Sequence, residues 1–346
     1  MTARESVRGY PRLNPTFVPV VTEEAVHFRA GPWSGPIYTL ESDTGTDQLV
    51  RLLELLDGTH PTTEIADRIG EPLTDLEAVL DQLHQNGIIV ESAAPDRKDD
   101  TSAIGGYLRL ADHLPEGSTE QLATTAVLLI ADGELGRITE EQLDRLGIET
   151  TTVLPVDRDD PAGIEETALE RAITATDFAV VTAAGPRPSL LKRIDTCTQD
   201  HETPWIVGQL QGYDGLIGPT VIPGESPCYG CYNARARANV RAPESFGAFE
   251  TLAESASRPP GPGLSAFSAI IAGHLAIETM TWVCAGVANT VGRVLHYDFH
   301  DLSVEASDVL RLPRCPVCQT AELPDTPRHV SLGQLLDTVH GEMPDA

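Results

Sequence analysis

The sequence CYGC at residues 228–231, with its counterpart CPVC at residues 315–318, decides how the C-terminal part of this chain folds. Each CxxC pair places two thiols at the spacing with which tetrahedral zinc is gripped from one side. The two pairs use four of the six cysteines in the chain, so four unrelated buried cysteines are a poor explanation. We therefore expect one structural zinc ion, held by Cys228, Cys231, Cys315 and Cys318.

Two other uses of paired cysteines fit this pattern less well. A catalytic zinc site keeps one coordination position open and usually includes histidine or carboxylate ligands, whereas four thiolates close the shell. A thioredoxin-like redox motif would explain one CxxC pair but not two. The remaining cysteines, Cys197 and Cys284, lie in sequences with helical patterns, and we expect them to pack in the core.

The composition indicates a strongly acidic protein that is long enough for two domains. The chain has 346 residues and a net charge of −28, and of its 24 basic residues only Lys98 and Lys192 are lysines. Acids spread along the whole chain suggest a high-salt cytoplasm, because a Debye length of about 3 Å in molar salt screens their repulsion. No basic patch stands out, which argues against a nucleic-acid partner.

Nothing in the sequence indicates secretion or a membrane partner. The N-terminal sequence MTARE lacks the apolar core of a signal peptide. The longest apolar stretch, at residues 265–287, is interrupted by His274 and Glu278, and a buried helix explains it better than a membrane span of about 18 apolar residues. We therefore expect a cytoplasmic protein.

Residues 1–92 have the pattern of a winged-helix-like α+β module. Short apolar runs separated by Gly-Pro pairs predict strands, and apolar residues at helical spacing predict helices. The expected strands cover 16–21, 25–29, 36–41 and 88–91, and the expected helices cover 46–56, 62–69 and 73–85. The last helix carries Asp75, Glu77 and Asp81 and no lysine or arginine, so it would repel DNA phosphates, and peptide binding is the better interpretation.

This module resembles the PqqD-like recognition elements that bind the leader segment of ribosomally made precursor peptides. The similarity rests on Asp57-Gly58, Glu64-Ile65-Ala66, and Leu83 followed by Gly87-Ile88-Ile89. The resemblance implies that the leader adds as a strand beside the third strand and rests against the third helix, a form of edge-strand addition. The implied binding residues are Ile37, Tyr38, Thr39, Leu40, Leu76, Val79, Leu80 and Leu83, although core packing would explain each of them singly.

A linker over 93–124, rich in Ala, Asp, Ser and Gly, precedes a second domain over 125–323 and a C-terminal tail over 324–346. In the second domain, short apolar runs alternate with helical patterns, which is typical of a parallel α/β sheet. The expected strands cover 127–130, 150–156, 178–182 and 204–208, and the expected helices cover 138–146, 164–175, 190–199 and 264–284. Short strands at 216–222, 293–299 and 303–312 flank a polar stretch at 242–262 that we expect to be mobile.

The second domain resembles the Rossmann-like fold of ThiF/MoeB-type activating enzymes. The most specific features are TPWIVGQLQGYDGLIGPTVIPGESPCYGCY at 203–232 and the segment from LHYDF to RLPRCPVC at 295–318. The resemblance implies a fold that commonly forms homodimers. It also implies an ATP site at a glycine-rich turn after the first strand, where main-chain N–H groups face phosphate.

The expected nucleotide site looks degenerate. The turn at 130–136 keeps Gly133 and Gly136 but carries Asp132 and Glu134, whose carboxylates would repel a triphosphate. No lysine lies between Lys98 and Lys192, and the loop at 183–186 lacks the aspartate that binds magnesium in such enzymes. We therefore regard Asp132, Gly133, Gly136 and Asp157 as a vestigial nucleotide site, expect ATP not to be a cofactor, and assign no catalytic residue.

The two resemblances together match one arrangement, the leader-binding partner ("C protein") of cyclodehydratases in thiazole/oxazole-modified peptide (TOMM) pathways, including bacteriocin biosynthesis. This resemblance implies a non-catalytic subunit that delivers a precursor peptide to a YcaO cyclodehydratase, which closes Cys, Ser or Thr side chains onto the preceding amide. The alternative is an ATP-dependent adenylating enzyme that acts on a peptide C-terminus or on a ubiquitin-like sulfur carrier.

Overall fold

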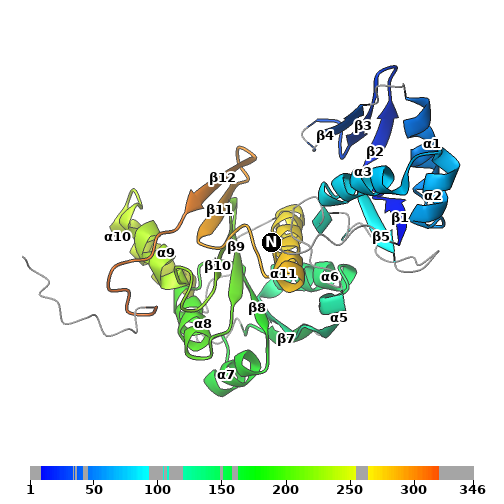
Figure 1. Cartoon of the computed structure of the whole chain (residues 1–346). Coiled ribbons are helices and arrows are strands. Elements are labelled where there is room, and N and C mark those ends of the chain that lie inside the picture. The colour runs from blue at the N-terminus through cyan, green and yellow to red at the C-terminus, as the bar shows by residue number, and fades with distance from the viewer. Residues whose placement is uncertain are drawn as a thin grey trace, which may run out of the picture.

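The computed structural model of the chain describes residues 9–33, 35, 37–41, 46–92, 104, 107–108, 120–148, 151–157, 163–254 and 264–318. These residues form two units with separate hydrophobic cores, an N-terminal unit within 9–92 and an α/β unit within 104–318 (Figure 1). The predicted C-terminal tail and most of the predicted linker lie outside the described residues.

The N-terminal unit contains a three-stranded antiparallel sheet, three helices and a separate two-stranded sheet. In chain order its elements are β1 (Tyr10–Leu13), β2 (Val18–Val21), β3 (Ala25–Arg29), β4 (Ile37–Glu41), α1 (Asp47–Leu55), α2 (Thr62–Ile69), α3 (Leu73–Gln85) and β5 (Ile89–Ser92). The larger sheet has the order β2-β3-β4. Its core joins Val26 and Phe28 of β3 to Leu52, Ile65 and Leu80 of the three helices.

One strand of this unit was not predicted from the sequence. β1 pairs antiparallel with β5, with Leu13 opposite Ile89. β1 has only four residues and contains Pro11, which lacks the N–H that a central strand must donate. A proline in a short run argues against a strand, and the pairing with β5 outweighs that preference here.

The α/β unit is built on a seven-stranded sheet with the order β12-β11-β10-β9-β8-β6-β7. β7, β6, β8 and β9 are parallel, and β10, β11 and β12 continue the sheet in antiparallel fashion. The strands are β6 (Val127–Ala131), β7 (Thr151–Pro155), β8 (Phe178–Ala183), β9 (Trp205–Gln211), β10 (Asp214–Val221), β11 (Arg293–Asp298) and β12 (Ser303–Asp308). The helices are α5 (Gln121–Thr124), α6 (Gly133–Arg145), α7 (Glu166–Thr174), α8 (Pro188–Asp200), α9 (Tyr229–Ala238), α10 (Pro243–Glu254) and α11 (Ser265–Ala285).

Helices cover both faces of this sheet, which is why the central strands read as continuous apolar runs. Along β6, Val127 and Leu129 pack into the core shared with α6 and α11, whereas Leu128 and Ile130 pack into the core shared with α7 and α8. Figure 1 shows α6 and α11 on one side of the sheet and α7 and α8 on the other. The expected alternation of strands and helices is therefore confirmed.

The structure corrects one helix boundary and one segment of the prediction. α6 begins at Gly133, five residues before the expected start at 138, and includes the turn that we assigned to phosphate binding. The stretch at 242–262, expected to be polar and mobile, contains α10 over Pro243–Glu254. In the described part of the chain, α11 is the one helix long and apolar enough to span a membrane. Within the protein, however, 61% of its most apolar 18-residue stretch is buried.

Candidate functional site

The four predicted zinc ligands converge beside α8 and α9. Their Sγ atoms all lie within 4.8 Å of one another, and among the described residues they form the one cluster of His, Cys, Asp or Glu suited to a metal ion. The Sγ atom of Cys228 lies 3.8 Å from that of Cys231 and 3.5 Å from that of Cys315. The Sγ atoms of Cys231 and Cys318 are 3.6 Å apart.

These separations fit a tetrahedral zinc ion. With Zn–S bonds of about 2.3 Å, tetrahedral geometry places sulfur atoms about 3.8 Å apart, close to the observed 3.5–3.8 Å. Burial raises the pKa of the Cys228 thiol. Burial also raises that of Cys315, but main-chain hydrogen bonds from Cys318 and Val317 outweigh it and leave its pKa below the usual value. Zinc would displace the thiol protons and hold all four groups as thiolates.

The chain brings the two CxxC pairs together through α9 and the segment after β12. Cys228 is the residue before α9, and Cys231 lies in the first turn of that helix. The N–H of Leu312 donates to Cys231 Sγ over 3.3 Å. Arg235 of α9 donates to the carbonyl oxygen of Leu310 over 2.8 Å, and Arg311 donates to that of Gly224 over 2.9 Å. These bonds join the first CxxC segment to the second independently of the metal.

Asp195 of α8 lies against the first CxxC segment. Its side chain is fully buried, and its two carboxylate oxygens accept hydrogen bonds from the main-chain N–H groups of Tyr229 (3.2 Å) and Gly230 (2.8 Å). Burial raises the pKa of Asp195 to about 6, although these bonds and one from Cys228 act in the opposite direction. A carboxylate from α8 thus caps the first turn of α9.

The opposite end of the parallel strands carries the residues of the expected nucleotide site. Asp132, at the end of β6, is fully buried. Its carboxylate accepts a hydrogen bond from the N–H of Ala184 (2.9 Å) and lies 3.6 Å from Nε of Arg187. Its own N–H donates to the hydroxyl of Thr182 over 2.8 Å. The carboxylate therefore points into the loop after β8, where it is matched by a main-chain donor and a guanidinium group.

The other residues of the expected nucleotide site have separate explanations. Gly133 has a φ of +61°, a conformation that favours glycine at the start of α6. A Cβ atom at Gly136 would lie 2.7 Å from Ala131, so this glycine allows α6 to pack closely on β6. Glu134 and Asp157 are exposed. The structure therefore places the four predicted residues at one end of the sheet, with Asp132 buried and Asp157 exposed.

The strand predicted to receive the leader, β4, pairs with β3 alone among the described strands. Its side chains alternate: Tyr38 and Leu40 pack against the core, whereas Ile37 and Thr39 are exposed on the outer face. Thr39 Oγ1 lies 3.1 Å from Nδ1 of His27 on β3, and Tyr38 packs edge-on against Phe17. Among the described residues, β4 is therefore paired along one edge and has no strand along the other.

The residues of α3 predicted to line the leader groove divide into two groups. Leu76, Leu80 and Leu83 are at most 5% exposed and form part of the core. Val79 is only partly buried against that core. A peptide lying between β4 and α3 would therefore contact Val79 before it reached the three leucines.

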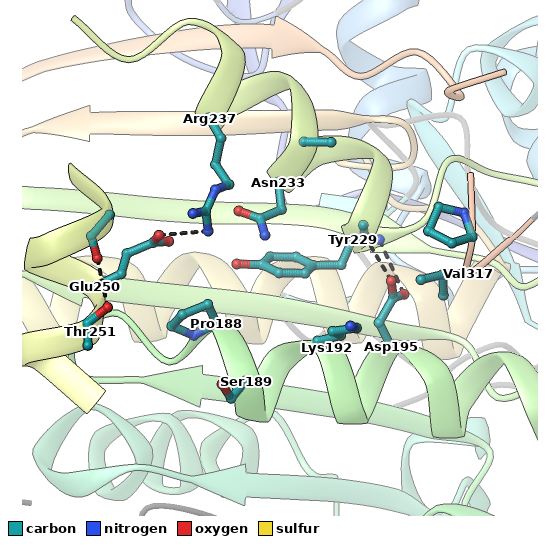
Figure 2. Close-up of a pocket in the computed structure, with 14 residues that line it drawn as sticks. Pro188, Ser189, Lys192, Asp195, Tyr229, Asn233, Arg237, Glu250, Thr251 and Val317 are labelled. Carbon is teal, nitrogen blue, oxygen red and sulfur yellow. Dashed lines mark hydrogen bonds and ion pairs between the residues drawn. The ribbon is translucent and has the colours of Figure 1, made fainter. Parts of the chain in front are cut away.

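Two cavities that the sequence did not predict lie beneath α10. One, of about 420 Å³, lies between α8, α9, α10 and the second CxxC segment, and the other, of about 340 Å³, lies towards the ends of β8 and β9. Tyr229, Asn233 and Glu250 line both. Figure 2 shows the Tyr229 ring extending between α8 and α9 and the ion pair of Arg237 with Glu250, at 2.7 Å, that holds α10 against α9.

Sequence reasoning missed Asp195 and the pair Arg237–Glu250. Asp195 contacts the main chain of Tyr229 and Gly230 from another helix, and Arg237 pairs with a residue of the next helix. Neither belongs to a local motif. A signal existed only for Asp195, because an acid among apolar residues of a helix (Leu190, Leu191 and Ile194) suggests a buried polar partner.

Residues 161–317 match the model of the ThiF family. The matched segment begins after β7, so the turn between β6 and α6 lies outside it. No curated protein matches the chain.

Two solved structures of heterocyclases have a similar fold. A heterocyclase in complex with substrate and cofactor has a TM-score of 0.65 at 17% identity, over 89% of this chain and 39% of its own. The heterocyclase TruD has a TM-score of 0.66 at 17% identity, over 89% of this chain and 42% of its own. This chain thus spans about two fifths of those proteins.

MccB from E. coli, solved with AMPCPP and its peptide MccA, has a TM-score of 0.66 at 13% identity, over 89% of this chain and 99% of its own. These similarities establish the fold, including the order of an N-terminal unit followed by an α/β unit of ThiF type.

Proposed function

We propose that this chain is a non-catalytic subunit that binds the leader of a ribosomal precursor peptide and delivers it to a YcaO cyclodehydratase, whose activity it stimulates. The observation that carries the proposal is the edge of β4 that no other described strand pairs with, in a unit that has its own core. An edge strand presents unpaired N–H and C=O groups to which an extended peptide can add.

The two edges of the three-stranded sheet are not equivalent. β2 forms one edge and contains Pro19, which removes a donor and blocks strand addition. β4 forms the other edge, and its five residues, IYTLE, contain no proline or lysine. A leader peptide would therefore pair with β4. By the resemblance to leader-binding modules it would also rest against α3, where Val79 is only partly buried. The acids of α3 favour basic leader residues.

The end of the sheet around Asp132 supports a non-catalytic role. The donors that could receive a phosphate there, the Ala184 N–H and the Arg187 guanidinium, already face the carboxylate of Asp132. ATP would have to displace a buried carboxylate and leave it without its partners, which costs several kcal/mol. We therefore infer that this chain does not use ATP, and that the YcaO partner supplies the ATP-dependent chemistry.

Zinc would serve as a structural ion in this account. Cys228 and Cys231 begin α9, whereas Cys315 and Cys318 follow β12, so one ion would close a long loop of the α/β unit. Four thiolates leave no position for water or substrate. The expected homodimer and the high-salt cytoplasm remain part of the proposal, the latter because of the net charge of −28.

The heterocyclases and MccB support a role in the biosynthesis of ribosomal modified peptides, since they share the fold and MccB is described as a microcin C7 biosynthetic enzyme. MccB also favours the alternative, an ATP-dependent adenylating enzyme, because this chain covers 99% of its length. The two candidates differ in whether this chain forms AMP without a partner.

Reconstitution tests the proposal directly. The precursor peptide and the YcaO partner are incubated with Mg·ATP, with and without this chain, and loss of water from the peptide is followed by mass spectrometry. We expect fast ring formation only when the chain is present and the leader is intact. Equal rates without the chain, or equal rates with a leaderless peptide, would contradict the delivery role.

A further inference from the structure

The first CxxC segment is held by a residue from outside both CxxC pairs. Cys228 provides no side-chain cap for α9, so the first N–H groups of the helix need other acceptors. Asp195 supplies both, with Oδ1 facing the N–H of Tyr229 and Oδ2 facing that of Gly230. Figure 2 shows this carboxylate rising from α8 beneath the start of α9.

The two CxxC segments and Asp195 pack closely around Gly230. A Cβ atom placed on Gly230 would lie 3.3 Å from Val317 of the second CxxC segment, 3.4 Å from the Cys228 sulfur and 3.5 Å from Asp195 Oδ2. Both CxxC segments and the Asp195 carboxylate therefore pack around one residue. A shift of Asp195 would move the main chain that sets the direction of the Cys228 sulfur.

A carboxylate is an unfavourable neighbour for four thiolates, because like charges repel strongly in a buried site. Asp195 is nevertheless fully buried beside Cys228, and its nearest compensation is the N-terminus of α9, with two N–H donors and the positive end of the helix dipole. A charge in this position makes sense if its hydrogen bonds hold the metal-binding segment in place.

We propose that Asp195 is a positioning residue of the zinc site, which fixes the Cys228–Cys231 segment in its metal-binding conformation and thereby slows zinc release. The inference rests on the zinc assignment made above. Residues that orient metal ligands without touching the metal typically change metal affinity by roughly 10–100-fold when they are replaced. The role also ties the metal to α8, and through α8 to the parallel sheet.

The test measures zinc release from the full chain to a chromogenic chelator under native conditions. Asp195→Ala removes both acceptors, and Asp195→Asn retains one. We expect release roughly 10–100-fold faster than wild type for the alanine variant and an intermediate rate for the asparagine variant. Asp200→Asn, an exposed acid on the same helix, and Asp132→Asn, a buried acid at the far end of the sheet, should release zinc at the wild-type rate.

The outcomes separate this inference from the assignment beneath it. Wild-type protein with one zinc and unchanged release from both Asp195 variants would overturn the positioning role and leave the zinc site intact. Wild-type protein without zinc would overturn both. If Asp195→Ala does not fold, the asparagine variant decides. Faster release from Asp132→Asn, equal to that of Asp195→Asn, would show a general loss of stability and would also overturn the role.

Discussion

The β4 edge of the N-terminal unit and the ends of β6 and β8 in the α/β unit use their hydrogen-bonding groups in opposite ways. Among the described strands β4 has a single neighbour, and Ile37 and Thr39 on its outer face are exposed. At the ends of β6 and β8, Asp132 is buried and faces the Ala184 N–H and Arg187. An open edge can take a partner, whereas matched buried charges resist one. We therefore expect the N-terminal unit to bind the leader peptide and the α/β unit to have a structural role.

The largest expected effect separates the two regions by removing the zinc. Cys228→Ser in the full chain should unfold the α/β unit, because metal affinity in small zinc sites is worth on the order of 10 kcal/mol of folding energy. The N-terminal unit has its own core and should still bind leader peptide. Elemental analysis and limited proteolysis would follow the change.

Cys197→Ser is the matched control, since Cys197 is a partly buried cysteine outside the quartet. It should leave zinc content and protease resistance unchanged. Wild-type protein that is well folded without zinc, or a Cys228→Ser protein as resistant as wild type, would contradict the assignment.

The next prediction tests whether the Asp132 carboxylate occupies the donors at the ends of β6 and β8. Asp132→Gly leaves the Ala184 N–H and Arg187 without the carboxylate, and breaking such a buried pair costs about 3 kcal/mol. Phosphate should then restore part of the lost stability by binding in the vacated position, as a rise in melting temperature that wild type does not show. Asp177→Asn, an exposed acid that accepts the Ala126 N–H, is the control. If phosphate raised the melting temperature of wild type, Asp132→Gly and Asp177→Asn equally, the Asp132 carboxylate would not be what keeps phosphate from this end of the sheet.

The β4 edge should respond to a single charge. Ile37→Asp places a carboxylate beside the added strand and should weaken leader binding by about 1.4 kcal/mol or more, a factor of about ten. Val20→Asp makes the same change at the β2 edge, beside Pro19, and should have no effect. Fluorescence polarisation with a labelled leader measures both in the full chain. Equal losses would place the leader elsewhere.

The smallest effect concerns pH. Burial raises the pKa of Glu278, but hydrogen bonds from His274, Thr290 and Asn289 outweigh burial and hold it below the usual 4.5. A lowered folded-state pKa contributes stability above the unfolded value, and this contribution is lost as pH falls through the folded value. Glu278→Gln should therefore reduce the loss of unfolding free energy between pH 6 and pH 3, to be measured with urea at fixed high salt. Identical pH dependence in both proteins would contradict this.

The sequence predicted those features that follow local rules. The CxxC spacing predicted the four cysteines whose sulfur atoms lie close together, and continuous apolar runs predicted the buried strands of the parallel sheet. α2 and α3 matched their predicted bounds, because both have apolar residues at helical spacing and end near Gly70 and Gly87. The leader groove remains a prediction, with Leu76, Leu80 and Leu83 placed in the core.

The features that were missed depend on contacts between separate elements. β1 becomes a strand because β5 pairs with it, and the paired residues Leu13 and Ile89 are 76 positions apart in the sequence. α10 is held against α9 by the ion pair between Arg237 and Glu250. The Arg237 guanidinium also lies over the Phe246 ring of α10, 6.0 Å from the ring centre. Asp132 was predicted to belong to a vestigial nucleotide site, but its burial against Arg187 could not be predicted from the turn alone.

Titration calorimetry of the full chain with Mg·ATP in molar potassium chloride tests the central claim most directly, followed by a pyrophosphate-release assay with precursor peptide. The account predicts no heat of binding and no pyrophosphate from this chain alone, with ATP consumed only after the YcaO partner is added. A micromolar dissociation constant, or AMP formed without that partner, would contradict the delivery role and favour the adenylating enzyme.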